Sequence, residues 1–295
     1  MDLRHFRIFL TVCEAGTMTQ AAKILYMTQP SVSQAIAELE KEYGVRLFER
    51  LSHRLHLTTA GERLRSYASH ILNLSEQARK ELADLGAGGS IRIGASLTIG
   101  AHLLPGIINA YRQEMPSVDI FTLVDNTSAI EKLILEDQLD LGLVEGPIYS
   151  KHIHEEKLSD DDLVIICGPG HSLWNKEKIP IHELAGNAFI IRESGSGTRD
   201  IFERLMSEAG ANWKIGGVYN NTEAIKQAVR GNLGLAVVPK IAVKEEIERG
   251  LVRVIEVVGL DLKREFNLVY HRQKFFTSAI QTFIRICMNF TPAAL

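Results

Sequence analysis

One face of residues 29–37 carries small, uncharged side chains with the chemistry needed to read DNA bases. This face consists of Gln29, Pro30, Ser33, Gln34 and Ala37. The opposite face, at helical spacing, is an apolar stripe that must be buried: Val32, Ala35, Ile36 and Leu39. A helix of this kind fits the major groove, where amide and hydroxyl groups contact base edges. An ordinary helical hairpin would show the same pattern.

Two short helices and a tight turn are needed to position that face. Thr17 and Gln20 have capping-box spacing at the start of the first helix. Thr28 can cap the second helix, and Pro30 lies in its first turn, where a missing N–H costs nothing. The segment therefore predicts a helix-turn-helix.

A basic ribbon is predicted directly after Gly44, where the second helix should end. Its basic side chains alternate with leucines, as a two-stranded ribbon with one buried face requires: Arg50, His53, Arg54 and His56 with Leu51, Leu55 and Leu57. Exposed arginines on such a wing can follow the DNA backbone or enter the minor groove. A solvated hairpin is the alternative.

Two clusters of hydroxyl groups in the C-terminal part have the chemistry of an anion site. Each follows a predicted strand and opens a predicted helix: Ser96 and Thr98 in the first cluster, and Ser194, Ser196, Gly197 and Thr198 in the second. Free N–H groups and hydroxyls at such turns bind anions. Either cluster taken alone could be an ordinary capped turn. Because the two clusters stand at equivalent positions in two similar lobes, they favour a ligand-binding cleft between the lobes.

Glu145 ends a third predicted strand and should point at the same cleft. A carboxylate there opposes a dianion and accepts a hydrogen bond from a ligand that keeps a proton. We therefore expect an effector that is a small oxyanion or carboxylate bearing a donor. Arg192 and Arg199 could add positive charge, but we do not expect either to touch the ligand.

The chain of 295 residues predicts a DNA-binding domain, a long helix and an α/β effector domain. We place the winged helix-turn-helix at 1–58 and the linker helix, with its heptad spacing, at 59–89; that helix should pair two subunits. Alternating strands and helices fill residues 90–295 and predict a two-lobed Rossmann-like domain. Lobe one should comprise 90–161 and 266–295, and lobe two 162–265, with crossovers near 162 and 265.

Charge and cysteine content limit the function classes. The chain has 33 Lys and Arg against 36 Asp and Glu, a net charge of −3. Non-specific DNA affinity should therefore be weak, with affinity coming from a dimer. Three separated cysteines in apolar runs indicate buried thiols in a reducing compartment. With no signal peptide and no membrane span apparent, we expect a cytoplasmic protein.

Enzyme, metal and cofactor chemistry find little support in the sequence. The run Glu193–Arg199 lacks the G-x-S-x-G spacing of a nucleophile elbow and is followed by no Walker lysine. We interpret residues 152–156, with their histidines and glutamates, as a polar loop and not a metal site. Asp140 and Glu145 could mimic paired carboxylates but have no evident substrate site. We expect no catalytic residues, metal or cofactor.

These residues resemble the LysR-type transcriptional regulators along the whole chain. The pattern includes Ala21-Ala22, Gln29-Pro30-Ser31-Val32-Ser33, Leu47-Phe48-Glu49-Arg50 and the second-lobe run Gly231–Pro239. The resemblance implies a winged helix-turn-helix, an effector domain similar to periplasmic binding proteins, and homodimers that often form tetramers. It is nearest to the branch of sulfur-assimilation and carbon-fixation regulators.

The resemblance also implies positions that contact double-stranded DNA. Contacts with bases or sugars would come from Gln29, Pro30, Ser33 and Gln34. Phosphates would be contacted by Ser31 and Arg50, and Arg54 would contact DNA from the wing. Family members often carry arginine where Gln34 stands, which puts the charge of that contact in doubt. The resemblance is also compatible with RNA polymerase as a further binding partner.

Three functions remain to be compared. The first is a DNA-binding regulator that responds to a small anion, with hydrogen sulfite suggested by the subgroup. The second is a solute-binding protein for small anions with no DNA role. The third is a regulator of the same type that answers to a small organic acid.

Overall fold

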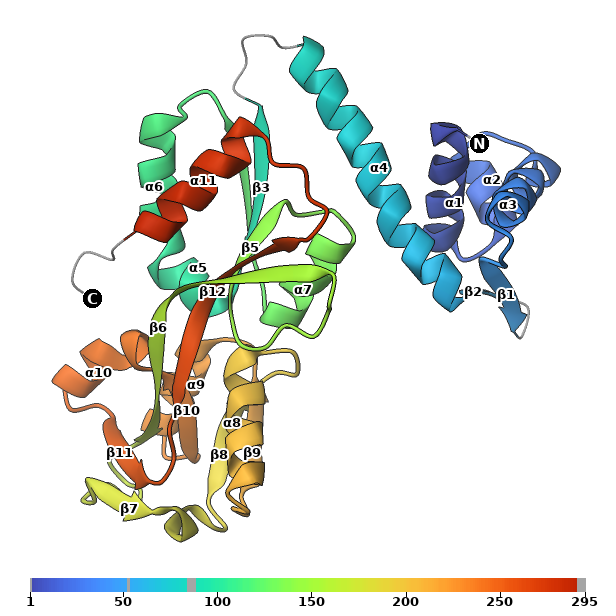
Figure 1. Cartoon of the computed structure of the whole chain (residues 1–295). Coiled ribbons are helices and arrows are strands. Elements are labelled where there is room, and N and C mark those ends of the chain that lie inside the picture. Colours follow the sequence, from blue (N-terminus) through green and yellow to red (C-terminus); the bar gives the residue numbers. More distant parts are fainter. Residues whose placement is uncertain (1, 52–53, 84–88, 291–295) are drawn as a thin grey trace. The chain divides into compact units, whose positions relative to one another are not determined.

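The computed structural model describes residues 2–51, 54–83 and 89–290 (Figure 1). The chain divides into two compact units. The first comprises residues 1–89 with 135–138, and the second comprises 90–134 with 139–295. Each unit has its own apolar core, so each is described by itself.

The first unit is a three-helix core followed by a hairpin and a long helix. Its elements are α1 (Leu3–Ala15), α2 (Met18–Ile24), α3 (Gln29–Tyr43), β1 (Phe48–Leu51), β2 (Arg54–Leu57) and α4 (Thr59–Ala83). Thr17 caps α2 and Thr28 caps α3, as the sequence predicts. Gly44 ends α3 with a φ of 66°, a left-handed conformation that glycine adopts without steric cost.

The cap of α4 differs from the capping box at Thr59 and Glu62 that the S/T-x-x-E spacing suggests. Thr58 is the capping residue: its hydroxyl accepts from the Gly61 N–H at 3.0 Å and donates to the Arg46 carbonyl at 2.7 Å. The Glu40 carboxylate accepts from the Leu47 N–H at 2.8 Å. These bonds fix the hairpin against α3 and α4.

Helix α4 carries both a buried and an exposed apolar stripe. Leu64 and Ala68 are buried in the core of the first unit. A second stripe is exposed at helical spacing and consists of Tyr67, Ile71, Leu74 and Ala78. The seven-residue spacing of Leu64, Ile71, Ala78 and Leu85, with Leu82 among the intermediate positions, predicts a seam between two helices. The structure instead places Leu64 in the unit's own core. Leu82 and Leu85, the other expected members, lie outside the side chains that are described.

The second unit alternates strands and helices. Its elements in chain order are β3 (Ser90–Ala95), α5 (Leu97–His102), α6 (Leu104–Glu114), β4 (Asp119–Val124), α7 (Thr127–Leu135), β5 (Leu141–Glu145), β6 (Ile153–Cys167), β7 (Lys178–Pro180), η1 (Ile181–Leu184), β8 (Ala188–Arg192), α8 (Gly197–Glu208), β9 (Lys214–Tyr219), α9 (Thr222–Arg230), β10 (Leu235–Pro239), η2 (Lys240–Val243), α10 (Lys244–Glu248), β11 (Arg253–Val258), β12 (Lys263–His271) and α11 (Ser278–Asn289). None of the described helices is long and apolar enough to cross a membrane.

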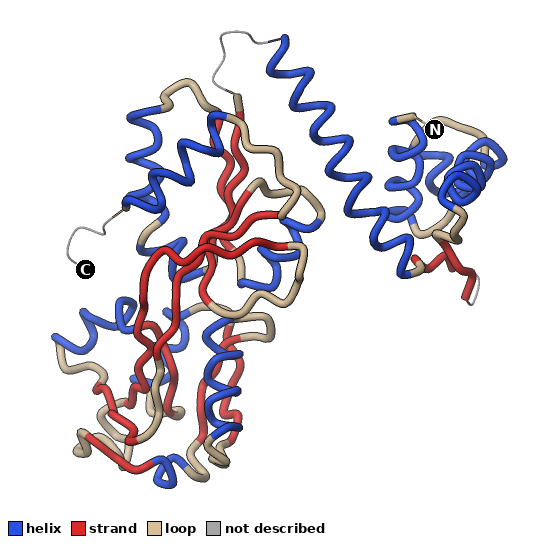
Figure 2. Tube along the Cα trace, in the orientation of Figure 1, coloured by secondary structure: helices blue, strands red, loops and turns tan. Residues whose placement is uncertain are grey.

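Strand order explains how two lobes form from one chain. The order is β4-β3-β5-β12-β6-β10-β8-β9, with parallel pairs at both ends and antiparallel pairs around β12 and β6. The long strands β6 and β12 pass from one half of the sheet to the other (Figures 1 and 2). Separate cores lie on either side: one contains Ile93, Leu143 and Phe283, the other Ile165 and Phe189. We call these halves lobe one and lobe two.

Strand β6 corrects the interpretation of residues 152–156 as a loop. Residues 153–156 pair with β12 in regular register, so the polar run forms the first part of a crossover strand. Its charged residues hide the strand signal because one side of this segment faces solvent. The expected crossover near residue 162 thus begins earlier in the chain.

Candidate functional site

The recognition helix α3 presents the predicted polar face to solvent. Its apolar stripe is buried against α1 and α2. On the other face Ser33 is half-buried, and the remaining predicted contact residues on this helix are exposed: Gln29, Pro30, Ser31 and Gln34. The hydroxyl oxygens of Thr28 and Ser31 lie 2.8 Å apart at the start of the helix, beside its free N–H groups. This geometry suits phosphate contact at the helix start and base contact further along.

A carboxylate on α3 was not anticipated from the sequence. The Gln34 amide donates to Glu38 Oε1 at 2.9 Å, and the other Glu38 oxygen lies 2.9 Å from His5 Nε2. Hydrogen bonds from His5 and Gln34 lower the pKa of Glu38, so it is ionised at neutral pH. The Gln34 amide therefore already has an intramolecular acceptor in this structure.

The wing has the predicted ribbon topology. Strands β1 and β2 pair antiparallel, with Arg50 opposite Leu55 and Leu51 opposite Arg54. The side chains of Arg50 and Arg54, and residues 52–53 including His53, lie outside the described part of the structure. Their contacts with DNA therefore stay a prediction.

The first hydroxyl cluster surrounds the carboxylate of Glu145. Ser96 follows β3, Thr98 lies in the first turn of α5, and Glu145 ends β5. The Ser96 hydroxyl donates to Glu145 Oε2. Glu145 Oε1 accepts from the Thr98 hydroxyl at 2.8 Å and from the Thr98 N–H at 3.3 Å. The protein's own carboxylate thus occupies the donors that the sequence assigned to a bound anion.

Arg264 on β12 joins the two lobes at this point and was missed in the sequence. Its side chain has 0% exposure. It donates to the Thr198 hydroxyl of lobe two at 2.8 Å and to the Thr98 hydroxyl of lobe one at 3.1 Å. It also donates to Asp161 Oδ2 at 2.6 Å and lies 3.9 Å from Glu145 Oε1. We call Thr98, Glu145, Asp161, Thr198 and Arg264 the interlobe cluster.

Only part of the second hydroxyl cluster reaches the first: Thr198 is linked to Thr98 through Arg264. Ser196 is buried at the start of α8, and Thr198 accepts from Arg264. Ser194 is exposed. Arg192 is buried and pairs with Glu193 at 2.8 Å, and Glu193 accepts from the Asn126 amide of lobe one at 3.3 Å. Asn126 therefore adds a second polar link between the lobes.

Backbone contact between two glycines shows that the lobes are closed. A Cβ on Gly197 would lie 1.8 Å from the Glu145 carbonyl oxygen, and one on Gly146 would lie 2.3 Å from the Gly197 Cα. Gly146 has a φ of 113°, which side chains rarely adopt. The Ser128 N–H also donates to the Gly195 carbonyl at 3.1 Å. Gly197, predicted as an effector contact, is thus first of all an interlobe contact.

The buried charges in the interlobe cluster do not balance if every group is ionised. Burial raises the pKa of Glu145 and of Asp161, while Arg264 opposes both shifts. Asp161 makes the close contact with Arg264, and Glu145 lies farther away. The raised pKa makes Glu145 easier to protonate than an exposed carboxyl group, and its acid form can donate a hydrogen bond.

Cavities flank the interlobe cluster. One of about 450 Å³ is lined by Thr98, His102 and Lys226, and one of about 810 Å³ by Arg264, Tyr149 and Arg204. A small ligand can therefore approach the interlobe cluster from either side. Among the described residues no three His, Cys, Asp or Glu side chains are placed to hold a metal ion.

The sequence offered weak signals for the residues it missed. Arg264 stands in a charged strand start, Lys263-Arg264-Glu265, that resembles any solvated edge, and Asp161 stands in a run of three aspartates. Asp140 lies at the opposite end of β5 from Glu145 and pairs with Arg92 and Lys274, each at 2.7 Å. The two carboxylates do not form a pair.

Comparison with known proteins gives a consistent result over both units. The family model "Bacterial regulatory helix-turn-helix protein, lysR family" matches residues 3–62, and "LysR substrate binding domain" matches residues 85–291. The chain is 32% identical over 287 residues to the "Uncharacterized HTH-type transcriptional regulator YeiE" of Escherichia coli (strain K12), with 97% of each chain covered. It is 32% identical over 286 residues to the RuBisCO operon transcriptional regulator of Allochromatium vinosum, covering 96% of this chain and 94% of that protein.

A solved structure extends the comparison to a bound ligand. The regulatory domain of CcmR from Synechocystis PCC6803, in complex with 2-PG, aligns with a TM-score of 0.63 and 26% identity. The alignment covers 68% of this chain and 96% of that domain.

We predict that Gly197→Ala forces the lobes apart, because the added methyl group meets the Glu145 backbone. The substitution should lower the free energy of unfolding by about 1–3 kcal/mol, as overpacking does. Urea unfolding measures this. Gly231→Ala is the matched control, since Gly231 has a φ of −76° and an added Cβ would meet its nearest atoms at 3.4 and 3.5 Å. Equal unfolding curves for the two variants would contradict the closed arrangement.

Proposed function

The chain belongs to the LysR-type transcriptional regulators, and we propose that a small anion bound at the interlobe cluster controls how it binds DNA. Its relatives are regulators and not enzymes. The family assignment argues against the alternative of a solute-binding protein with no DNA role. Within the cytoplasm we expect the protein to bind promoter DNA through α3 and the wing, and to contact RNA polymerase from there.

One observation carries the proposed effector site: hydroxyls from both lobes converge on a single buried guanidinium. Thr98 and Thr198 both accept from Arg264, so an anion that replaces these bonds touches both lobes at once. Such a ligand changes the balance between open and closed lobes through its different contacts in each. That change would alter the spacing of paired recognition helices.

The charge balance favours a monoanion that carries a proton, with hydrogen sulfite as our candidate. Ionised Glu145 and Asp161 would leave an excess negative charge beside Arg264, which opposes a dianion. A protonated Glu145 instead donates to the ligand. Ser96, Thr98, Ser196 and Thr198 supply further hydroxyls, and Ser194 and Gly197 lie in the adjoining turn. A small organic acid is the alternative, and a panel of ligands separates the two.

We predict that sulfite affinity falls as pH rises through the raised pKa of Glu145, because ionisation removes a donor and adds a repelling charge. Glu145→Gln should flatten this dependence and bring the sulfite and sulfate affinities closer together. Calorimetric titration across pH measures both effects, and comparison with wild type removes the ligand's own titration. Ser207→Ala, exposed on α8, is the control. Unchanged discrimination in Glu145→Gln would end this assignment.

We propose that subunits pair through the exposed stripe of α4. Replacing Ile71 and Leu74 by Asp places two charges in this apolar contact and should convert oligomers to smaller species in analytical ultracentrifugation. Adding the same two charges elsewhere, by Ser207→Asp and Gln281→Asp, should leave the mass unchanged. An unaltered oligomer in the α4 variant would place the interface elsewhere.

We predict that Gln29→Ala weakens binding to the DNA upstream of the protein's own gene by about fivefold or more. A bidentate amide contact with a base contributes about 1–3 kcal/mol of discrimination. A gel-shift titration at fixed salt measures the affinity. Gln227→Ala in the second unit is the control, because it removes the same amide far from α3 in the sequence. Equal affinities would exclude Gln29 from the DNA contact.

A further inference from the structure

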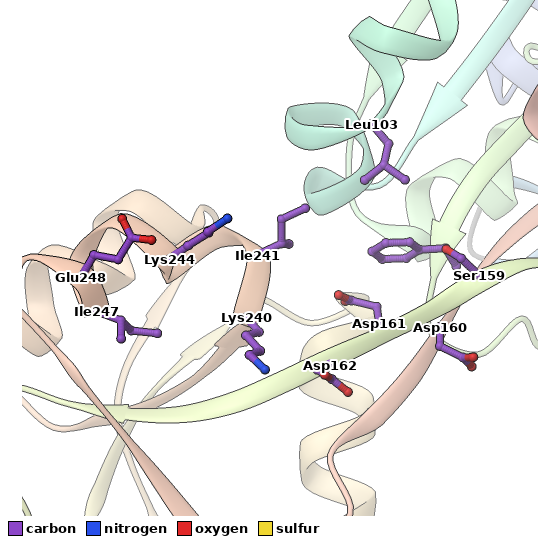
Figure 3. Close-up of a pocket in the computed structure, with 11 residues that line it drawn as sticks. Leu103, Ser159, Asp160, Asp161, Asp162, Lys240, Ile241, Lys244, Ile247 and Glu248 are labelled. Carbon is purple, nitrogen blue, oxygen red and sulfur yellow. The ribbon is translucent and has the colours of Figure 1, made fainter. Parts of the chain in front are cut away.

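A cavity of about 680 Å³ lies beside the crossover strand β6, on the side of η2 and α10 (Figure 3). Leu103 and Phe266 are buried in its wall, and Ile241 and Ile247 are half-buried there. In Figure 3 Leu103 and Ile241 approach from opposite sides. The volume is within the range of small-molecule sites, which are typically about 300–1,000 Å³.

Charged groups of both signs also line this cavity: Asp160, Asp161, Asp162 and Glu248 are acidic, and Lys240 and Lys244 are basic. Figure 3 shows Lys240 beside the β6 segment that carries Asp161 and Asp162. Neither Lys240 nor Asp162 has an ion-pair partner among the residues the structure describes, although Lys263 lies opposite Asp162 across the strand pair. Asp161 is already paired with Arg264 at 2.6 Å.

We propose that this cavity binds a free α-amino acid with an apolar side chain. The ammonium and carboxylate groups of such a ligand are adjacent, and Lys240 and Asp162 both line the cavity without an ion pair between them. The side chain then contacts Leu103, Ile241, Ile247 and Phe266.

Other ligand classes fit the cavity less well. A dianion would face four carboxylates, those of Asp160, Asp161, Asp162 and Glu248. A metal ion would face the ammonium groups of Lys240 and Lys244 as well as the apolar side chains. A purely apolar ligand would leave the charged end unused. A zwitterion satisfies both signs and the apolar wall, and it carries no net charge into a partly buried place.

This site is distinct from the proposed effector site, although the two share Asp161. The cavity is lined by Asp161 but by no hydroxyl of the interlobe cluster. Its occupant and the anion can therefore be tested separately. Asp161 is unsuitable for mutation here because its loss would also leave Arg264 with one fewer partner.

Calorimetric titration of the full-length protein with L-leucine and L-phenylalanine tests the proposal. We expect saturable binding of at least one, and at least tenfold weaker binding of 3-methylbutylamine and 4-methylpentanoate, which each keep one charge of leucine. Lys240→Ala and Asp162→Asn should each weaken the amino acid at least tenfold. Lys214→Ala, an exposed lysine on β9, and Ser96→Ala in the cleft should leave it unchanged.

Three results would overturn the proposal. The first is an absence of binding by both amino acids. The second is binding that Lys240→Ala and Asp162→Asn do not affect. The third is binding lost in Ser96→Ala, which would place the amino acid in the cleft. Sulfite titration of the same Lys240→Ala protein should match wild type, so failure of this site and failure of the effector site give different results.

Discussion

The second unit depends on one buried guanidinium placed between two carboxylates and two hydroxyls. Burying an ion costs several kcal/mol, and the cost is offset only when its donors are satisfied. Arg264 satisfies its donors with groups from lobe one, lobe two and the crossover strand β6. The closed arrangement of the lobes and the hydrogen bonding of Arg264 are therefore linked, because opening the lobes removes at least one of its partners.

Under the proposed function, that dependence is what would let a small ligand act on the lobe interface. Gly146 and Gly197 bring the two backbones into contact, and an added side chain at either position would prevent that contact. Shifting a two-state equilibrium from one extreme to the other needs about 5.5 kcal/mol of differential binding. Several charge-assisted hydrogen bonds, each contributing about 1.5–3 kcal/mol, reach that magnitude. An anion that accepts the hydrogen bonds now donated to Glu145 and those donated by Arg264 could thus in principle shift the lobes from one state to the other.

The sequence predicted local structure better than it predicted the site. Thr28, Pro30 and Gly44 determine the ends of α3 through short-range chemistry, and those ends were found. The first part of β6 was missed because charged residues on a solvent-facing strand resemble a loop. The position of Ser96, Thr98 and Thr198 near the lobe interface could be predicted, because strand ends in an α/β sheet meet at one edge. Arg264 could not, because its role depends on a crossover strand that brings distant segments together.

The modest charge of the chain has a consequence for how the two units act together. With a net charge of −3 and an ionised Glu38 on the recognition helix, one isolated DNA-binding unit has little electrostatic attraction for DNA. Specific binding then depends on two recognition helices reaching successive half-sites, about 34 Å apart or at multiples of this distance. Because paired binding is needed for affinity, a small change in subunit geometry has a large effect on occupancy. Under the proposed function, weak single-site affinity is what would let a ligand at the interlobe cluster act on DNA binding.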